Sequence, residues 1–173
     1  MNSTGYQRAI SLRQRDIMNR DKAKKILAFF GEIDGRIAFN AQLINSMEDK
    51  YYSLNSRDEP DGMPKAKHRT TSPTESVALN IPQAVSEAIR HWREENERLY
   101  KLKTAIAEEL IRLPQAQRTV VYDFYVHGYK WIRIAQKLNY SERQCQNIRN
   151  IALNKLSRNF SNNKRVAEYD YPE

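Results

Sequence analysis

The segment from Ser141 to Phe160 is rich in amide and guanidinium side chains, whereas a helix surface that only needs to be soluble can use Glu and Lys. An amide donates and accepts hydrogen bonds, and a guanidinium donates through a planar fork. Both match the donor and acceptor patterns that base edges present in double-stranded DNA. The side chains expected to point outward from this segment are Arg143, Gln144, Gln146, Asn147, Arg149, Asn150 and Asn154.

A helix is predicted to begin at Ser141, because Gln144 follows three residues later and the two can form a reciprocal capping box. Asn139 and Tyr140 form the turn before it, and Asn tolerates the left-handed conformation that such a turn needs. The helix then has an inward stripe at steps of three and four, made of Cys145, Ile148, Ala152 and Leu156.

Two shorter helices are predicted before this turn, at about residues 115–126 and 130–138. Pro114 suits the start of the first one, and Gly128 can take the left-handed cap after it. The side chains expected to face inward are Val120, Val121 and Phe124 in the first helix and Ile132, Ala135 and Leu138 in the second. Three such helices predict a helix-turn-helix DNA-binding domain at residues 114–160, followed by a tail at 161–173.

The capped end of the last helix could enter a major groove, which is about 12 Å wide. Arg can bind guanine at two acceptors, Asn can bind adenine through a donor and an acceptor, and Glu can accept from cytosine. The candidate base contacts are Glu142, Arg143, Gln146 and Asn147. Cations beside them would bind phosphates, with an affinity that falls as salt rises. The candidate phosphate contacts are Arg118, Lys130, Arg133, Lys155 and Arg158.

The charge of the chain is concentrated in this region. The whole chain carries a net charge of +8, and residues 114–165 alone hold ten Lys or Arg against Asp123 and Glu142. A basic block of this kind is typical of a phosphate-binding surface. A basic surface kept for solubility, on a helical bundle whose polar face only meets water, is the alternative interpretation.

Two long helices are predicted earlier in the chain, at about residues 22–54 and 82–112. The first has apolar residues at steps of four and three, which is the spacing of a coiled coil. Asn40 interrupts this row, and a polar residue at such a position commonly fixes the register of the paired helices. A break near Gly31 and Gly35 is allowed, since each costs about 1 kcal/mol relative to Ala. The two stripes are Ile26, Phe30, Ile33, Ile37, Ile44, Met47, Tyr51 and Leu54, then Val85, Ile89, Trp92, Leu99, Leu102, Ile106, Leu110 and Leu113.

A loop rich in Pro and Gly is predicted at residues 55–80, and residues 1–21 form a basic N-terminal arm, either a short helix or a flexible segment. The two long helices should pair, as an antiparallel hairpin within one chain or between the chains of a homodimer. The sequence therefore predicts an all-α protein, in which a long helical hairpin or coiled coil precedes the helix-turn-helix domain.

Several other classes are disfavoured. The single Cys145 allows neither an internal disulfide nor a cysteine metal cluster, and it is expected to serve packing. No apolar run is long enough for a membrane span and the N-terminus lacks a secretory signal, so a cytoplasmic location is expected. His68, His91 and His127 fall in unrelated places, so neither an enzyme nor a bound cofactor or metal is expected.

The stretch Leu113–Leu156 resembles the fourth region of bacterial sigma factors. The residues that match that pattern are Leu113-Pro114, Arg118, Ile134-Ala135, Leu138, Ser141, Ile148 and Ala152-Leu153-Asn154-Lys155-Leu156. In that family the module binds an upstream promoter element and touches RNA polymerase. The resemblance implies promoter DNA and bacterial RNA polymerase as partners, and it places the four candidate base contacts at the family's base-contacting positions. Two departures are Asn139 for the usual glycine and Arg133 for an acidic residue, the latter bearing on the polymerase contact.

The coiled-coil front, the loop and this module together resemble the ArpU-like and RinA-like activators of late transcription from phages of Gram-positive hosts. This resemblance implies a phage-encoded activator in the cytoplasm of a bacterial host. Two alternatives remain. One is a small terminase-like adaptor for DNA packaging, which assembles as a ring of many chains. The other is a regulator that binds RNA polymerase without touching DNA.

Overall fold

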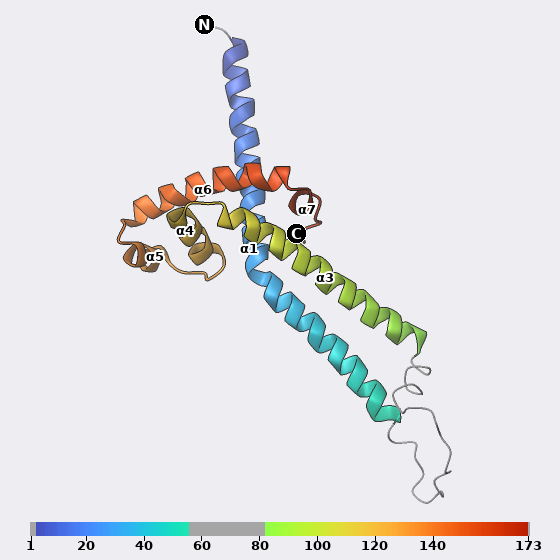
Figure 1. The fold of residues 1–173 in the computed structure, drawn as a ribbon. Helices are drawn as coiled ribbons and strands as arrows, with labels where there is room; N and C mark the ends of the chain where they lie inside the picture. The colour runs from blue at the N-terminus through green and yellow to red at the C-terminus, as the bar shows by residue number, and fades with distance from the viewer. Residues whose placement is uncertain (1–2, 56–81, 173) are drawn as a thin grey trace, which may run out of the picture. The chain divides into compact units, whose positions relative to one another are not determined.

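The computed structural model describes the backbone of residues 3–55 and 82–172, and the side chains of residues 20–50 and 82–172. Every regular element in those ranges is a helix, which confirms the all-α prediction (Figure 1). The elements are α1 (Ser3–Asn55), α3 (Gln83–Ile111), α4 (Gln115–Tyr125), α5 (Trp131–Leu138), α6 (Glu142–Asn162) and α7 (Lys164–Ala167). The predicted loop at 55–80, apart from Asn55, lies outside the described residues, as do His68 and the side chains of Tyr51 and Leu54.

The chain divides into two compact units, which are described separately. The small unit is Gly35–Arg98, and the large unit consists of Met1–Asp34 and Leu99–Glu173. Helices α1 and α3 each contribute to both units, whereas α4 to α7 belong to the large unit alone.

Helix α1 is continuous over 53 residues. It therefore includes most of the predicted arm at residues 1–21, and it shows no break at Gly31 or Gly35. A Cβ added at Gly31 would lie 3.2 Å from the carbonyl oxygen of Tyr125 and 3.3 Å from Cα of Val126. Gly31 thus lets the C-terminal end of α4 approach α1 closely, and its role is packing.

In the small unit, α1 and α3 run in opposite directions beside each other (Figure 1). Asn40 is only 5% exposed, and its Nδ2 donates to Oδ1 of Asn96 at 2.9 Å. Further along, Arg93 and Glu48 form an ion pair at 2.8 Å. Asn40 is thus a buried polar residue with a satisfied partner on the facing helix, as expected of a residue that fixes register.

The described side chains of the predicted α1 stripe are buried from Ile26 to Ile44, and Met47 is half-buried. The α3 stripe is buried at Ile89 and from Leu99 to Leu113, and it is half-buried at Val85 and Trp92. The two helices therefore bury the faces that the sequence pattern assigned to the core.

In the large unit, α4, α5 and α6 pack around a core of Val120, Ile134, Ala135 and Cys145. The prediction that Ile132 faces inward is wrong, because its side chain is 58% exposed. Residues 132 and 134 lie about 200° apart around a helix of 3.6 residues per turn, so α5 cannot bury both against one core. Ile134 takes the inward position, and Leu138 lies half-buried on the same side.

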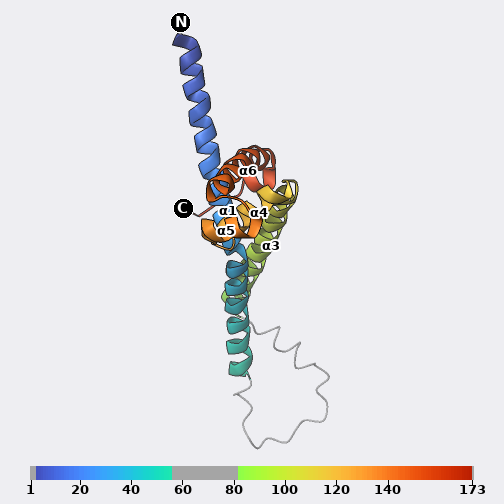
Figure 2. The same ribbon diagram turned by 90° about the vertical axis from the view of Figure 1, so that its left-hand side faces the viewer.

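The C-terminal half of α6 lies against α1 within the large unit (Figure 2). Lys22, Ala23 and Ile26 of α1 line one narrow hollow together with Ser157, Phe160 and Ser161 of α6. Beyond α7, the rings of Tyr169 and Tyr171 each lie 5.6 Å from the ring of Phe29. The segment predicted only as a tail therefore contains a short helix and packs its aromatic residues on α1.

Candidate nucleic-acid interface

Helices α5 and α6 are joined by the three residues Asn139, Tyr140 and Ser141. Asn139 has the left-handed conformation that its side chain type suggested, with φ 56° and ψ 40°. The N–H of Tyr140 donates to the carbonyl of Ala135 at 3.1 Å, which closes the end of α5. The turn is therefore tight and held by backbone hydrogen bonds.

The start of α6 is capped and open to solvent. The backbone N–H of Gln144 donates to Oγ of Ser141 at 3.2 Å, which is the predicted cap from the Ser141 side. The side chains of Ser141, Glu142, Arg143 and Gln144 are all exposed. The first turn of α6 thus presents its polar groups outward.

The candidate base contacts do not all share one surface. Arg143 and Asn147 are exposed and lie on one face of α6, because they are four residues apart. Asn150 and Asn154 continue this face and are also exposed. Glu142 is exposed in the first turn, whereas Gln146 is half-buried at the edge of the packed side. We call the row Arg143, Asn147, Asn150 and Asn154 the amide face.

Arg149 was expected to point outward, but it is half-buried. Its guanidinium carbon lies 5.1 Å from the ring centroid of Trp131 and 5.5 Å from that of Phe124. These two rings are themselves stacked, with centroids 4.4 Å apart. An Arg side chain over aromatic faces gains a cation–π attraction, so Arg149 is part of the packing between α4, α5 and α6.

The five candidate phosphate contacts fall into two groups. Lys130, Arg133, Lys155 and Arg158 are exposed, and Arg133 lies over the ring of Tyr129 at 3.7 Å from its centroid. Arg118 is half-buried, and its guanidinium donates to the carbonyl oxygen of Ile111 at 3.2 Å. Arg118 thus satisfies an open carbonyl at the C-terminal end of α3 and is less available to an anion than the other four.

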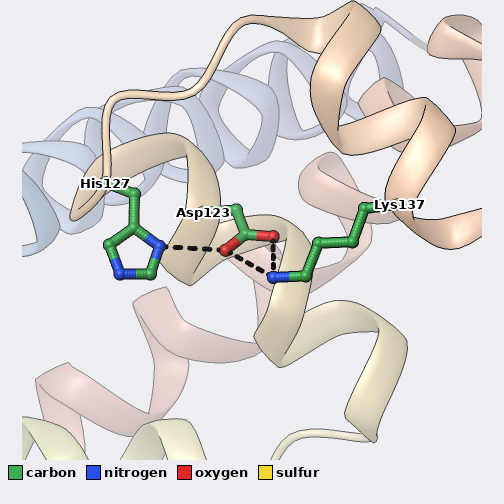
Figure 3. Close-up of polar contacts among 3 residues, drawn as sticks. All are labelled: Asp123, His127 and Lys137. Atoms are coloured by element: carbon green, nitrogen blue, oxygen red, sulfur yellow. Dashed lines mark hydrogen bonds and ion pairs between the residues drawn. The ribbon is translucent and has the colours of Figure 1, made fainter.

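A buried carboxylate that the sequence analysis missed lies between α4 and α5 (Figure 3). Asp123 of α4 is 2% exposed, and Nζ of Lys137 on α5 donates to its two oxygens at 2.8 and 3.1 Å. Nδ1 of His127 lies 3.0 Å from the same carboxylate. These contacts tie α4 and the loop after it to α5. The i, i+4 spacing of Asp123 and His127 was a signal, but Lys137 is distant in sequence.

Burial also affects two weakly acidic groups in this unit. It raises the pKa of the Cys145 thiol, so the side chain stays protonated in the core, in line with the packing role expected for it. Burial likewise raises the pKa of Tyr125, which the nearby charge of Arg149 partly offsets.

Within the described residues, no group of three or more His, Cys, Asp or Glu side chains is placed to hold a metal ion. No described helix combines the length and apolar character needed to cross a membrane. Comparison of the chain with protein-family models, curated proteins and solved structures finds no match.

Proposed function

We propose that this chain is a sequence-specific double-stranded DNA-binding transcription regulator, in which the N-terminal half of α6 enters the major groove. The observation that carries the proposal is the amide face, which begins at an exposed, capped helix end directly after a tight turn from α5. Arg and Asn at consecutive turns of one helix face are suited to contact neighbouring base edges.

The surrounding charge supports the same function. Four exposed cations lie on α5 and α6 or directly before α5, and they are Lys130, Arg133, Lys155 and Arg158. Residues 114–165 hold ten Lys or Arg against two acidic residues, and one of those two, Asp123, is buried and paired with Lys137. The solvent-facing charge is therefore strongly positive, as a phosphate-binding surface requires.

The fuller proposal is a phage or prophage activator of late genes that acts at a promoter with host RNA polymerase, in the manner of sigma region 4. It draws on the resemblance of Leu113–Leu156 to that region. A single module of this size generally buries about 600 to 1,000 Å² on DNA, so specific binding needs a second copy of the chain or the polymerase. A homodimer or a complex with polymerase at the promoter supplies that additional surface.

The test of base contact uses Arg143→Ala in the full chain. On a DNA site selected by the wild-type protein, the variant should lose about 1 to 3 kcal/mol of binding free energy, and it should lose little on random DNA. Arg90→Ala is the control, because Arg90 is an exposed Arg of the small unit outside the amide face. Equal losses for Arg143→Ala on both DNAs would contradict base recognition.

The polymerase part needs a separate measurement. Recovery of host RNA polymerase and of promoter DNA with the tagged chain from a lysate would support an activator. A ring of many copies bound to DNA without polymerase would favour the packaging adaptor. Polymerase recovered equally well with Arg143→Ala and with Asn147→Ala, in the absence of DNA binding, would favour a regulator that contacts protein alone.

A further inference from the structure

Asn150 lies at the centre of the amide face, three residues after Asn147 and four before Asn154. The sequence analysis placed it outward but assigned it no base contact. NH2 of Arg149 donates to its Oδ1 at 3.1 Å. The side chain that presents this amide is therefore held by a neighbour on the same helix.

The orientation of the Asn150 amide follows from donor and acceptor chemistry. A guanidinium has only donors, so the atom of Asn150 that faces it must be the oxygen. Arg149 is in turn kept in place by the stacked rings of Trp131 and Phe124. The oxygen of Asn150 is thus engaged inward, and its NH2 group remains for the solvent side.

We infer that Asn150 is a specificity-determining residue that presents its NH2 donor to DNA and selects guanine over adenine at one base pair of the DNA site. A free Asn amide pairs with adenine by donating to N7 and accepting from the N6 amino group. The oxygen of Asn150 is turned towards Arg149 rather than towards that amino group, whereas guanine presents only acceptors, N7 and O6, to the NH2 group of Asn150 in the major groove. This inference rests on the proposed function, because it concerns the same helix in the same groove.

The inference assigns Arg149 a positioning role. It is half-buried beside the amide face, and its guanidinium donates to Asn150 of that face. Replacing Arg149 by Met keeps an unbranched apolar side chain over the two rings but removes the donor. The amide of Asn150 could then rotate, turn its oxygen towards the DNA and accept a hydrogen bond from the N6 amino group of adenine.

The experiment selects DNA sites from a random double-stranded library with the full wild-type chain. It then measures binding to the best site with guanine or adenine at each position. The wild type should favour guanine at one position by about 5- to 100-fold. Arg149→Met should bring that ratio towards one, and Asn150→Asp, which can only accept, should replace the guanine preference with a preference for cytosine.

Asn154→Asp is the matched control, because it adds the same negative charge one turn further along the same exposed face, whereas Arg149 donates to Asn150. It should weaken binding without changing the guanine-to-adenine ratio at that position. A ratio unchanged by both Arg149→Met and Asn150→Asp overturns the inference, and so does an equal loss of the ratio in Asn154→Asp. If the wild type selects no sequence at all, the proposed function fails as well. Asn150→Asp keeps Arg149 in place, so the test stands even if Arg149→Met does not fold.

Discussion

The side chain of Asp123 is held by two partners that are themselves partly in water. Lys137 is 51% exposed and His127 is 42% exposed, whereas Asp123 is 2% exposed. Removing the carboxylate returns both partners to solvent at modest cost. Removing Lys137 leaves a buried carboxylate with His127 alone, and an underpaired buried charge is expensive. The contribution of this pair therefore depends on which partner is deleted.

We expect Lys137→Met to lower the free energy of unfolding by about 2 to 4 kcal/mol and Asp123→Asn by about 1 to 2 kcal/mol. Urea denaturation of both variants, at one pH and salt concentration, measures the difference. The double variant should resemble Asp123→Asn, because Lys137 has lost its anionic partner in both. If the two single variants are equally destabilised, water reaches Asp123 more freely than its burial indicates.

The sequence could not predict which group each side chain of the site contacts. It predicted Arg118 as a phosphate contact and Arg149 as an outward side chain of the polar helix face, and the structure gives each another contact. Arg118 donates to Ile111, seven residues earlier, and Arg149 lies over the rings of Trp131 and Phe124. The charge pattern shows which part of the chain is rich in Arg, but the contacts of each Arg side chain depend on how α3 to α6 pack.

At the scale of helices, local rules predicted the elements well and their packed faces less well. The cap at Ser141 and the left-handed turn at Asn139 are both present, because each follows from residue types within a few positions. The inward face of α5 was misassigned at Ile132 because eight residues are too few for periodicity to fix a face. The sequence left a break at Gly31 open, and it could not show that this glycine makes room for α4, because that contact joins residues far apart in the chain.

The two glycines of α1 should respond differently to substitution by alanine. Nothing lies within 4 Å of a Cβ added at Gly35, so Gly35→Ala should stabilise the protein by about 0.5 to 1 kcal/mol through its higher helix propensity. The same change at Gly31 places a methyl group against backbone atoms of Tyr125 and Val126. It should give no gain or a loss. Thermal unfolding of both variants checks this, and equal gains would show that α4 does not approach α1 so closely.

The packing of the C-terminal segment on α1 should make the free energy of unfolding depend on pH in alkaline solution. Burial raises the pKa of Tyr171 above its ordinary value of 10.0, and its hydroxyl donates to the carbonyl of Val166 at 3.0 Å. The stability that follows from a raised pKa is complete below the unfolded value and is lost as pH rises towards the folded value. Wild-type stability should therefore fall above about pH 10 for this reason.

Tyr171→Phe removes the ionisable group but keeps the ring beside Phe29. Near pH 7 it should be less stable than the wild type by about 0.5 to 1.5 kcal/mol, the value of the lost hydrogen bond. Above about pH 10 that gap should narrow and then reverse, since the variant has no phenol at this position to ionise. Urea denaturation of the two proteins between pH 7 and pH 11 tests it. A constant gap would mean that Tyr171 is open to solvent.

At the scale of the whole chain, the feature predicted most directly by the sequence is the distribution of charge. Positive charge gathers in residues 114–165 whatever the fold, because it depends only on composition. Which of those charges can meet a phosphate is a property of the folded large unit. Lys155 and Arg158 are exposed on α6, while Arg118 is engaged with Ile111.

Salt dependence of DNA binding should separate these cations. Each phosphate contact releases counterions, so Lys155→Ala and Arg158→Ala should each reduce the slope of log K against log salt by about one, equally on selected and random DNA. Arg118→Ala should leave the slope almost unchanged and lower the free energy of unfolding, because it removes a hydrogen bond at the end of α3. Titrations between about 50 and 200 mM salt measure the slopes. A reduction of about one for Arg118→Ala would mean that its guanidinium leaves Ile111 for a phosphate when DNA binds.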